Sequence, residues 1–196
     1  MSFFEFNEKS ALAVDSRSPI TAGVYEATID TVSTRVASTG TKGLDYSFTL
    51  KDGRKAIVYG SWIQNSKGEM LLDGDKLNSL MGILGVKSLT EYDKTIDVKD
   101  GKKIVKALKE FDGKSIMVAL FNETDVYQGE ERQNLKIHSF FNKDGFSYSE
   151  IVAKATEAKK IAYVREKIKD TQSKRAKQAE AFGGNDAAEE SADSLL

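Results

Sequence analysis

Glycine-marked turns divide most of this chain into short segments, and this spacing constrains its fold more than any other feature. Pairs such as Asp52-Gly53, Asp112-Gly113 and Asp144-Gly145 recur along the sequence, and glycine supplies the positive φ that tight turns need. Between two such turns, residues 44–50 alternate strictly between apolar and polar side chains, which is typical of a strand with one buried face. The chain is therefore expected to be mainly β-structure.

Five segments have strand character, at residues 24–32, 44–50, 55–63, 115–121 and 133–141. The fourth is apolar on both faces, so we expect it to be buried on both sides of a sheet. Residues 51–54 predict a hairpin turn between the second and third strands, and residues 123–132 predict a hairpin loop between the fourth and fifth.

Helices are expected between the third and fourth strands. Apolar residues recur at helical spacing from Leu77 to Leu84, and Asp73 or Asp75 is the expected N-cap. The same spacing predicts a short helix over residues 102–111.

A long basic helix is expected after the last strand. Its apolar stripe runs from Ile151 to Ile168, and Ser149 is its expected N-cap. The Gly183-Gly184 pair ends helical character. The residues that follow are small and acidic, so they are expected to be disordered.

Five strands with helices inserted after the third fit a five-stranded OB-like barrel, and a simple sandwich fits almost as well. The predicted organisation is an N-terminal arm (1–18), an OB-like nucleic-acid-binding domain (19–148), a basic C-terminal helix (149–182) and a disordered acidic tail (183–196).

The charge of the chain is balanced overall but segregated near its C-terminal end. The 29 Lys and Arg residues and 30 Asp and Glu residues give a net charge of −1. Residues 151–180 hold nine basic and four acidic residues, whereas residues 183–196 hold four acidic residues and no basic one. This abrupt reversal calls for a functional explanation.

The composition excludes several classes of function. The chain has no Cys and a single His, His138, which excludes disulfide scaffolds, Cys-based zinc sites and thiol catalysis. It has no Walker-type phosphate loop and no nucleophile elbow, so we expect neither an enzyme nor a cofactor. No run of 18 apolar residues and no secretory signal occurs, so a cytoplasmic protein without membrane contact is expected.

The order of several motifs along the chain resembles one known family. The motifs are residues 20–26 (ITAGVYE), 40–44 (GTKGL), 60–62 (GSW), 80–82 (LMG), 111–114 (FDGK) and 134–140 (NLKIHSF), followed by the acidic end. In this order they resemble the single-stranded DNA-binding proteins of tailed bacteriophages.

The resemblance implies an OB fold that binds and protects single-stranded DNA without sequence preference during phage DNA replication, recombination and repair, in the bacterial host cytoplasm. It also implies an acidic tail that recruits phage or host replication and recombination proteins. The expected tail residues are Asp186, Glu189, Glu190, Asp193, Leu195 and Leu196. Such tails often end in an aromatic residue, whereas this chain ends in two leucines, which leaves the tail partner unidentified.

Aromatic rings and cations along the third strand predict the binding surface. Rings stack on unpaired bases and Lys or Arg side chains pair with phosphates. The expected nucleic-acid-binding residues are Arg35, Lys42, Arg54, Lys55, Tyr59, Trp62, Arg132 and Lys136. Because Tyr59 and Trp62 are three residues apart, they share a face only if Gly60 marks a bulge.

The acidic tail has a second expected role, because it mimics a run of phosphates. We expect it to occupy the basic groove when DNA is absent and to release its Leu195-Leu196 end to a partner when DNA binds. Deleting residues 184–196 is then expected to tighten DNA binding, most visibly at low salt.

Each of these assignments has an alternative. A core position is the alternative for Trp62, since large aromatic residues dominate small cores, and Tyr46 and Phe48 are expected in the core. Phe3, Phe4 and Phe6 are candidates for docking on the barrel or for contacts in a homo-oligomer. The alternative function is a phage protein-interaction module or DNA-mimic inhibitor of a host protein. A metal-dependent nuclease is a third function class, with Asp73, Asp75, Glu91 and Asp93 as its candidate ligands.

Overall fold

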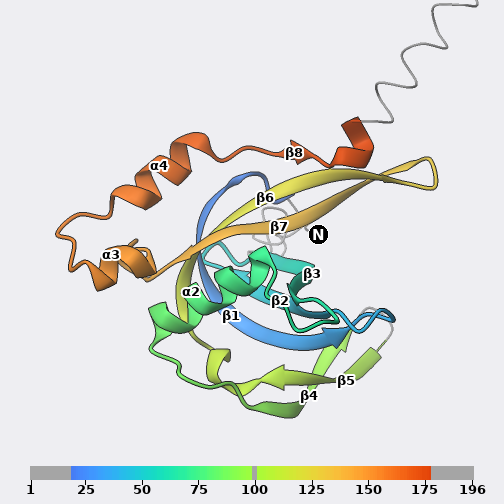
Figure 1. The fold of residues 1–196 in the computed structure, drawn as a ribbon. Helices are drawn as coiled ribbons and strands as arrows, with labels where there is room; N and C mark the ends of the chain where they lie inside the picture. The colour runs from blue at the N-terminus through green and yellow to red at the C-terminus, as the bar shows by residue number, and fades with distance from the viewer. Residues whose placement is uncertain (1–18, 99–100, 178–196) are drawn as a thin grey trace, which may run out of the picture.

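A single sheet of eight strands forms the framework of the part of the chain that the structure describes (Figure 1). This computed structural model describes residues 19–98 and 101–177. Its strands are β1 (Gly23–Val36), β2 (Lys42–Leu50), β3 (Lys55–Gln64), β4 (Glu91–Val98), β5 (Gly101–Leu108), β6 (Ser115–Tyr127), β7 (Glu130–Phe141) and β8 (Thr171–Gln172). Its helices are α2 (Leu72–Leu84), the 3-10 helix η1 (Lys109–Phe111), α3 (Tyr148–Val152) and α4 (Lys159–Lys167). The prediction of a mainly β fold is confirmed, and the five expected strands are β1, β2, β3, β6 and β7.

The sheet branches at β1, which is its central strand. Along one edge β1 pairs with β2, and β2 pairs with β3, all antiparallel. Along the other edge, the first half of β1 pairs with β6, whereas its second half meets β5 at the single pair Ser33–Ala107. Two hairpins, β4–β5 and β6–β7, therefore leave the same strand at different points. β8 adds to β6 as the parallel strand of this sheet.

A register shift in β1 determines which of its side chains face the core. The pairing with β2 skips one residue between Ile29 and Thr31. Ile29 and Val32 are consequently both fully buried although they are three residues apart. This bulge turns Ser33 away from the core and toward the outer face of the sheet.

The main core lies between the curved sheet and α2. It includes Ile29, Val32, Tyr46, Phe48, Leu80, Phe111, Ile116 and Phe140. Tyr46 and Phe48 stack with their ring centroids 5.8 Å apart, so the expectation that both are core residues is confirmed. Burial raises the pKa of the Tyr46 hydroxyl, and the nearby Asp73 carboxylate adds to this effect.

A second apolar cluster lies on the other side of β6 and β7. Met117, Ala119 and Phe141 pack there against Ile161 and Val164 of α4. The segment of β6 from residue 116 to residue 120 is therefore buried on both faces, as its continuous apolar sequence predicts. This cluster attaches the C-terminal part of the described chain to the sheet of the same molecule.

The predicted hairpin between β6 and β7 is confirmed, but its loop is much shorter than residues 123–132, because both strands continue through most of this segment. The connection is only Gln128-Gly129, with φ values of 54° and 79°. Two successive residues with positive φ form a turn whose twist matches that of the flanking strands. Strand pairing therefore extends to Tyr127 and Glu130.

The predicted helix over residues 102–111 is also wrong. Residues 101–108 form β5, which pairs along its whole length with β4, a strand that the sequence analysis missed. Ile104 is 68% exposed, so the apolar spacing that suggested a helix does not mark one buried face. Pairing with β4 decides the structure of this segment, and within residues 101–111 only η1 is helical.

The predicted long C-terminal helix, part of the basic segment assigned to residues 149–182, is wrong as well. The structure instead has α3, a bend, α4 and β8 in this region (Figure 1). Glu150 explains the bend, because its buried carboxylate accepts the backbone N–H of Ser147 at 2.9 Å and that of Lys160 at 2.9 Å. One side chain thus caps the first turns of both helices, and Ser147 rather than Ser149 is the N-cap of α3.

The helix expected near residues 77–84 is confirmed as α2, but its predicted cap is wrong. Its N-cap is Leu71, which makes no side-chain capping bond, and Asp73 and Asp75 lie inside its first turn. Carboxylates there still interact favourably with the helix dipole.

The closed five-stranded barrel is not confirmed. β3 and β7 contact each other, but no strand pairing joins them within the described residues, so the sheet stays open at this seam. Among residues 19–98 and 101–177, none of the helices combines the length and the apolar character that crossing a lipid bilayer requires. The expected N-terminal arm, with Phe3, Phe4 and Phe6, and the expected acidic tail lie outside the described residues.

Candidate nucleic-acid interface

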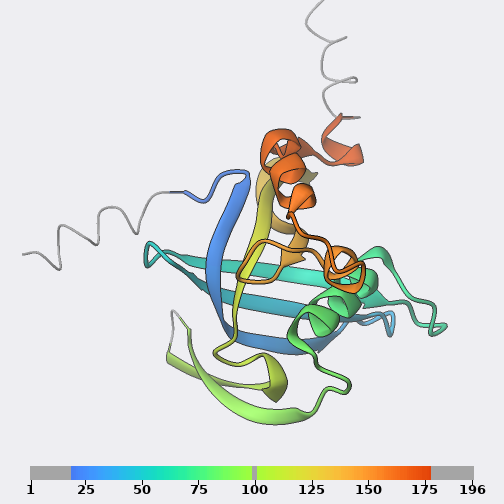
Figure 2. The same ribbon diagram turned by 90° about the vertical axis from the view of Figure 1, so that its left-hand side faces the viewer.

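A groove runs between the outer face of β1–β2–β3 and the β4–β5 hairpin, which curves beneath these strands in Figure 2. Its volume is about 620 Å³. The residues that line it are Thr31, Ser33, Asp45, Tyr46, Ser47, Ile57, Tyr59, Ile96, Asp97, Val98, Lys103 and Val105. The floor therefore comes from the three-stranded sheet and the wall from the hairpin.

The floor of the groove is the solvent-facing side of alternating strands. Asp45 and Ser47 alternate along β2 with the core residues Tyr46 and Phe48, and Asp45 lies opposite Ser33 of β1. On β3 the side chain of Tyr59 is 63% exposed. The same face thus offers hydroxyl groups, a carboxylate and an accessible ring.

A bulge at Gly60 brings Tyr59 and Trp62 to this one face. Gly60 has a φ of +65°, and β3 carries one extra residue where it pairs with β2. Trp62 consequently lies opposite Gly43, two residues from Asp45 and on its side of the sheet. The predicted bulge is confirmed.

Trp62 is a half-buried residue of the outer face rather than a core residue. A side chain at Gly43 would place its Cβ 2.6 Å from the indole Cε3, so only glycine lets the ring lie against β2. The Arg35 guanidinium lies over the ring at 5.7 Å from its centroid, and its Nη1 is 3.4 Å from Asp45 Oδ1. Arg35 and Trp62 therefore form a stacked cation and ring at the end of the groove.

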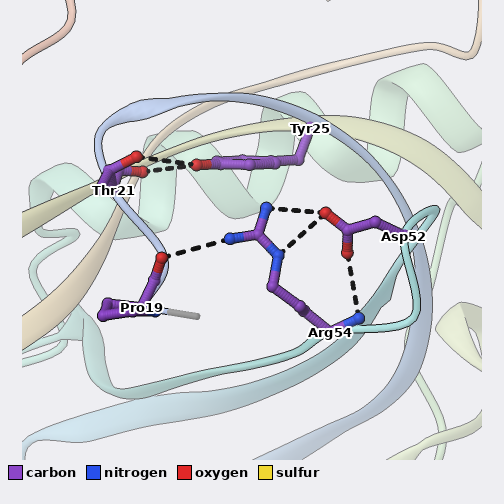
Figure 3. A network of polar contacts seen from close by, with 5 residues as sticks. All are labelled: Pro19, Thr21, Tyr25, Asp52 and Arg54. Carbon is purple, nitrogen blue, oxygen red and sulfur yellow. Dashed lines mark hydrogen bonds and ion pairs between the residues drawn. The ribbon is translucent and has the colours of Figure 1, made fainter. Parts of the chain in front are cut away.

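Arg54 lies away from the groove, although it was expected to line the site. Its guanidinium donates to Asp52 Oδ2 from Nε at 2.9 Å and from Nη2 at 2.7 Å, and to the Pro19 carbonyl at 3.2 Å (Figure 3). It also lies 5.5 Å from the centroid of the Tyr25 ring, whose hydroxyl donates to the Thr21 carbonyl. Hydrogen bonds from Arg54 lower the pKa of Asp52. This network fastens the start of β3 to the segment before β1.

Two of the expected lysines lie near opposite ends of β2. Lys55 Nζ is 3.0 Å from Asp30 Oδ2 and also contacts the Thr49 hydroxyl, at one end of the outer face. Lys42 is exposed at the start of β2, and no ion pair involves it within the described residues. At both positions a lysine side chain could contact the phosphates of a nucleic-acid strand that runs along the groove.

A smaller hollow of about 240 Å³ adjoins the seam between β3 and β7. Lys136, Lys76, Phe121 and Tyr59 are among its lining residues, so Tyr59 borders both hollows. Lys136 Nζ lies 3.9 Å from Glu123 Oε2, and Lys76 Nζ pairs with Asp73 at 2.8 Å. The surface around Tyr59 therefore continues from the groove to the cations of the second hollow.

Arg132 lies near the turn of the β6–β7 hairpin and lines neither hollow. It pairs with Glu130 at 3.1 Å and lies 5.2 Å from the centroid of the Tyr127 ring. Of the eight expected residues, the structure thus groups Arg35, Tyr59 and Trp62 most closely, with Lys42, Lys55 and Lys136 around them. It separates Arg54 and Arg132 from this group.

The wall of the groove was not predicted from the sequence, because β4 was not among the predicted strands. Ile96 and Val98 of β4 and Lys103 and Val105 of β5 line that wall. Tyr92, Ile96 and Val98 lie at alternate positions of β4 with polar residues between them, and this alternation was the signal available in the sequence. Lys94 anchors the hairpin, since its Nζ donates to the Asp30 carbonyl at 2.6 Å and lies 2.9 Å from Asp112 Oδ1.

The candidate residues for a nuclease do not assemble into a metal site. Asp73 and Asp75 lie on α2, whereas Glu91 and Asp93 lie on β4. No cluster of three or more metal-ligating side chains occurs in residues 19–98 and 101–177. His138 is exposed on β7, with Nδ1 3.0 Å from the Ser139 hydroxyl.

The six expected tail residues, from Asp186 to Leu196, lie outside the described residues.

Comparison with known proteins adds no assignment, since no protein-family model matches the chain and a search of the curated proteins finds no match.

Proposed function

We propose that this chain binds single-stranded DNA without requiring a fixed sequence. The observation that carries the proposal is the placement of Tyr59 and Trp62 on one outer face of the sheet, where Tyr59 lines a groove and the Arg35 guanidinium lies over the Trp62 ring. Unpaired bases expose flat apolar faces, and each base that stacks on a ring contributes about 1–3 kcal/mol. Cations around the groove then pair with phosphates.

The connectivity of the sheet supports an OB-like fold as the framework of this site. β1, β2 and β3 form a meander, β6 returns to β1, and β7 follows β6 and packs next to β3. These five strands follow the order of an OB barrel that is open between its third and fifth strands. The groove lies on the β2–β3 face, the face that such folds use for oligonucleotides.

The biological role follows from the resemblance and remains part of the proposal. The protein coats and protects single strands during phage DNA replication, recombination and repair in the host cytoplasm, and it is not an enzyme. Its acidic tail recruits replication and recombination proteins. The near-neutral net charge of −1 means that the local cations around the groove, rather than the whole-molecule field, supply the attraction to phosphates.

One titration tests the proposal against its alternatives. Fluorescent oligo(dT) is titrated with the full chain at several salt concentrations, with and without magnesium. We expect saturable binding that weakens as salt rises, together with quenching of the fluorescence of Trp62. Degradation of the oligonucleotide only with magnesium would instead indicate a nuclease. Absence of binding at low salt would favour a protein-interaction module.

Tyr59→Ala provides the sharper arm of this experiment. The variant is expected to lose about 1–3 kcal/mol of binding free energy through the lost base stack, with little change in stability because the side chain is exposed. Tyr163→Ala is the matched control, since Tyr163 lies on α4 and is 64% exposed against 63% for Tyr59. Equal affinities for the two variants would contradict the assignment of Tyr59.

A further inference from the structure

The groove is rich in hydrogen-bond acceptors and poor in cations. Besides its tyrosines, its polar side chains are Thr31, Ser33, Asp45 and Ser47 on the floor and Asp97 and Lys103 on the wall, with Lys103 as its one lysine. A phosphate placed in the groove would face the carboxylates of Asp45 and Asp97. A strand bound in the groove therefore turns its bases inward and leaves its phosphates to the cations outside the floor.

Asp45 is the best-defined acceptor in the groove. Its Oδ1 accepts the backbone N–H of Gly60 at 2.8 Å and lies 3.4 Å from Arg35 Nη1. Its Oδ2 receives no hydrogen bond from any described residue, and the side chain is 21% exposed. These two contacts fix the carboxylate in place, so Oδ2 offers a pre-oriented acceptor in the groove that Tyr59 also lines.

An ionised carboxylate only accepts hydrogen bonds, and this property distinguishes between the bases. Cytosine presents an amino group at C4, which donates to a carboxylate. Uracil and thymine present a carbonyl oxygen at the same position, which a carboxylate repels, and their one donor on this edge, the ring N3–H, lies between two carbonyl oxygens. The apolar parts of the site, Tyr59, Ile57 and Val105, accommodate either ring equally well.

We propose that the groove takes bases edge-inward and that Asp45 makes it favour bases with an exposed amino group, such as cytosine, over uracil and thymine. The inference rests on the proposed function and adds a preference in base composition to it. Binding still requires no fixed sequence, because one acceptor that selects an amino group does not define an ordered series of bases.

Oligo(dC) and oligo(dU) of equal length test this preference, because their rings differ at C4 and in protonation at N3. Dissociation constants are measured at pH 8 and constant salt for the full chain and for Asp45→Asn. The asparagine amide both donates and accepts, so it satisfies either base. We expect the full chain to favour oligo(dC), and the preference to fall by about five-fold in the variant, as expected for one lost base-edge contact.

One control variant and one further test variant separate the preference from general effects. Asp93→Asn removes the same charge from the exposed side of β4, where Asp93 pairs with Lys106 at 2.8 Å and lines neither hollow. It is expected to leave the ratio of the two affinities unchanged. Asp97→Asn tests the second carboxylate without disturbing the contact between Arg35 and Asp45.

The outcomes distinguish this inference from the proposed function. Tight binding of both oligonucleotides with equal affinity, or a preference that survives in Asp45→Asn and in Asp97→Asn, would overturn the inference and leave single-strand binding intact. No binding of either oligonucleotide by the full chain would overturn both. If the ratio falls in Asp97→Asn alone, the amino-group preference is retained but its assignment to Asp45 is overturned.

Discussion

The two hairpins that leave β1 differ in how they are supported, and this difference separates a part of the sheet with many supporting contacts from a part with few. The β6–β7 hairpin pairs with β1 over six residues, is covered by α4 and receives β8 along its edge. The β4–β5 hairpin meets β1 at a single residue pair and is anchored near its base by Lys94. The less supported hairpin, β4–β5, forms the wall of the groove.

The β6–β7 hairpin gains its support from side chains that are distant in sequence. Asp170 Oδ1 accepts the backbone N–H of Asn122 at 2.7 Å, and the Ser173 hydroxyl donates to Asp125 at 2.5 Å. The wall of the groove has no such cover within the described residues. The proposed binding of single strands of varied composition would benefit from a wall with few supporting contacts, while the β6–β7 hairpin supports the remainder of the sheet.

Phe141→Ala is the strongest test of this contrast. Phe141 is 1% exposed and joins β7 to α4, so the truncation is expected to cost about 3–5 kcal/mol of unfolding free energy. The matched change on the other hairpin, Ile104→Ala, is expected to cost about 0.5 kcal/mol or less, because its side chain is exposed. Urea unfolding of both variants measures the difference, and equal losses would remove the basis for the comparison.

Glu150→Ala is expected to have the next largest effect, about 2 kcal/mol. The truncation leaves the N–H groups of Ser147 and Lys160 without their acceptor. Hydrogen exchange is expected to accelerate in α3 and α4 while β4 and β5 are unaffected. Acceleration spread evenly over the whole sheet would instead mean that α4 is not a separate brace.

The same residue predicts a pH dependence. Burial by itself raises the pKa of Glu150, but hydrogen bonds from the Lys160 and Ser147 backbone and from the Ser147 hydroxyl outweigh it and lower the pKa from its ordinary value of 4.5. The stabilisation is therefore present above pH 4.5 and is lost as the pH falls through the lower pKa of the folded state. Glu150→Gln, measured beside the natural chain, is expected to remove this part of the acid sensitivity.

Lys94→Met addresses the other hairpin and is expected to cost about 1 kcal/mol. It removes the contacts of Lys94 with the Asp30 carbonyl and with Asp112, to which the Tyr92 hydroxyl also donates. We expect faster hydrogen exchange in β4 and β5, unchanged exchange in β6 and β7, and weaker binding of oligo(dT). Unchanged binding despite a loosened hairpin would show that the wall does not contribute to affinity.

Arg132→Ala is expected to have the smallest effect, about 0.5 kcal/mol or less on stability and on oligo(dT) affinity. Its guanidinium is already paired with Glu130 and stacked on Tyr127, and exposed ion pairs contribute little. A large loss of affinity would place the tip of the β6–β7 hairpin in the binding path and enlarge the site that we describe.

Local sequence patterns predicted the elements whose structure is determined mainly by the residues of the segment itself. The strict alternation of residues 44–50 identified β2, and the glycine at position 60 identified the bulge that orients Trp62. Neither required knowledge of a distant partner. The same holds for α2, whose leucines recur at helical spacing.

The errors arose where a distant partner decides the structure. Residues 102–108 have an apolar spacing compatible with a helix, and they form a strand because β4 pairs with them. The apolar stripe from Ile151 to Ile168 is interrupted because the Glu150 carboxylate caps a second helix start. Arg54 does not line the groove, because its partners, Asp52 and the Pro19 carbonyl, hold it beside the segment before β1. A groove beside the third strand was expected, but its wall was not predicted, since that wall belongs to the β4–β5 hairpin.

The skipped residue in β1 has a consequence for how this chain tolerates insertions and deletions. Unbroken alternation from Ile29 would direct residues 31, 33 and 35 toward the interior, because side chains alternate strictly along a strand. Deleting the unpaired Asp30 is therefore expected to keep every later side chain on its present face, whereas pairing Asp30 in register with β2 would send the Ser33 hydroxyl and the Arg35 guanidinium into the apolar interior. The register shift at this one position of β1 therefore decides which of its side chains form the polar outer face of the sheet.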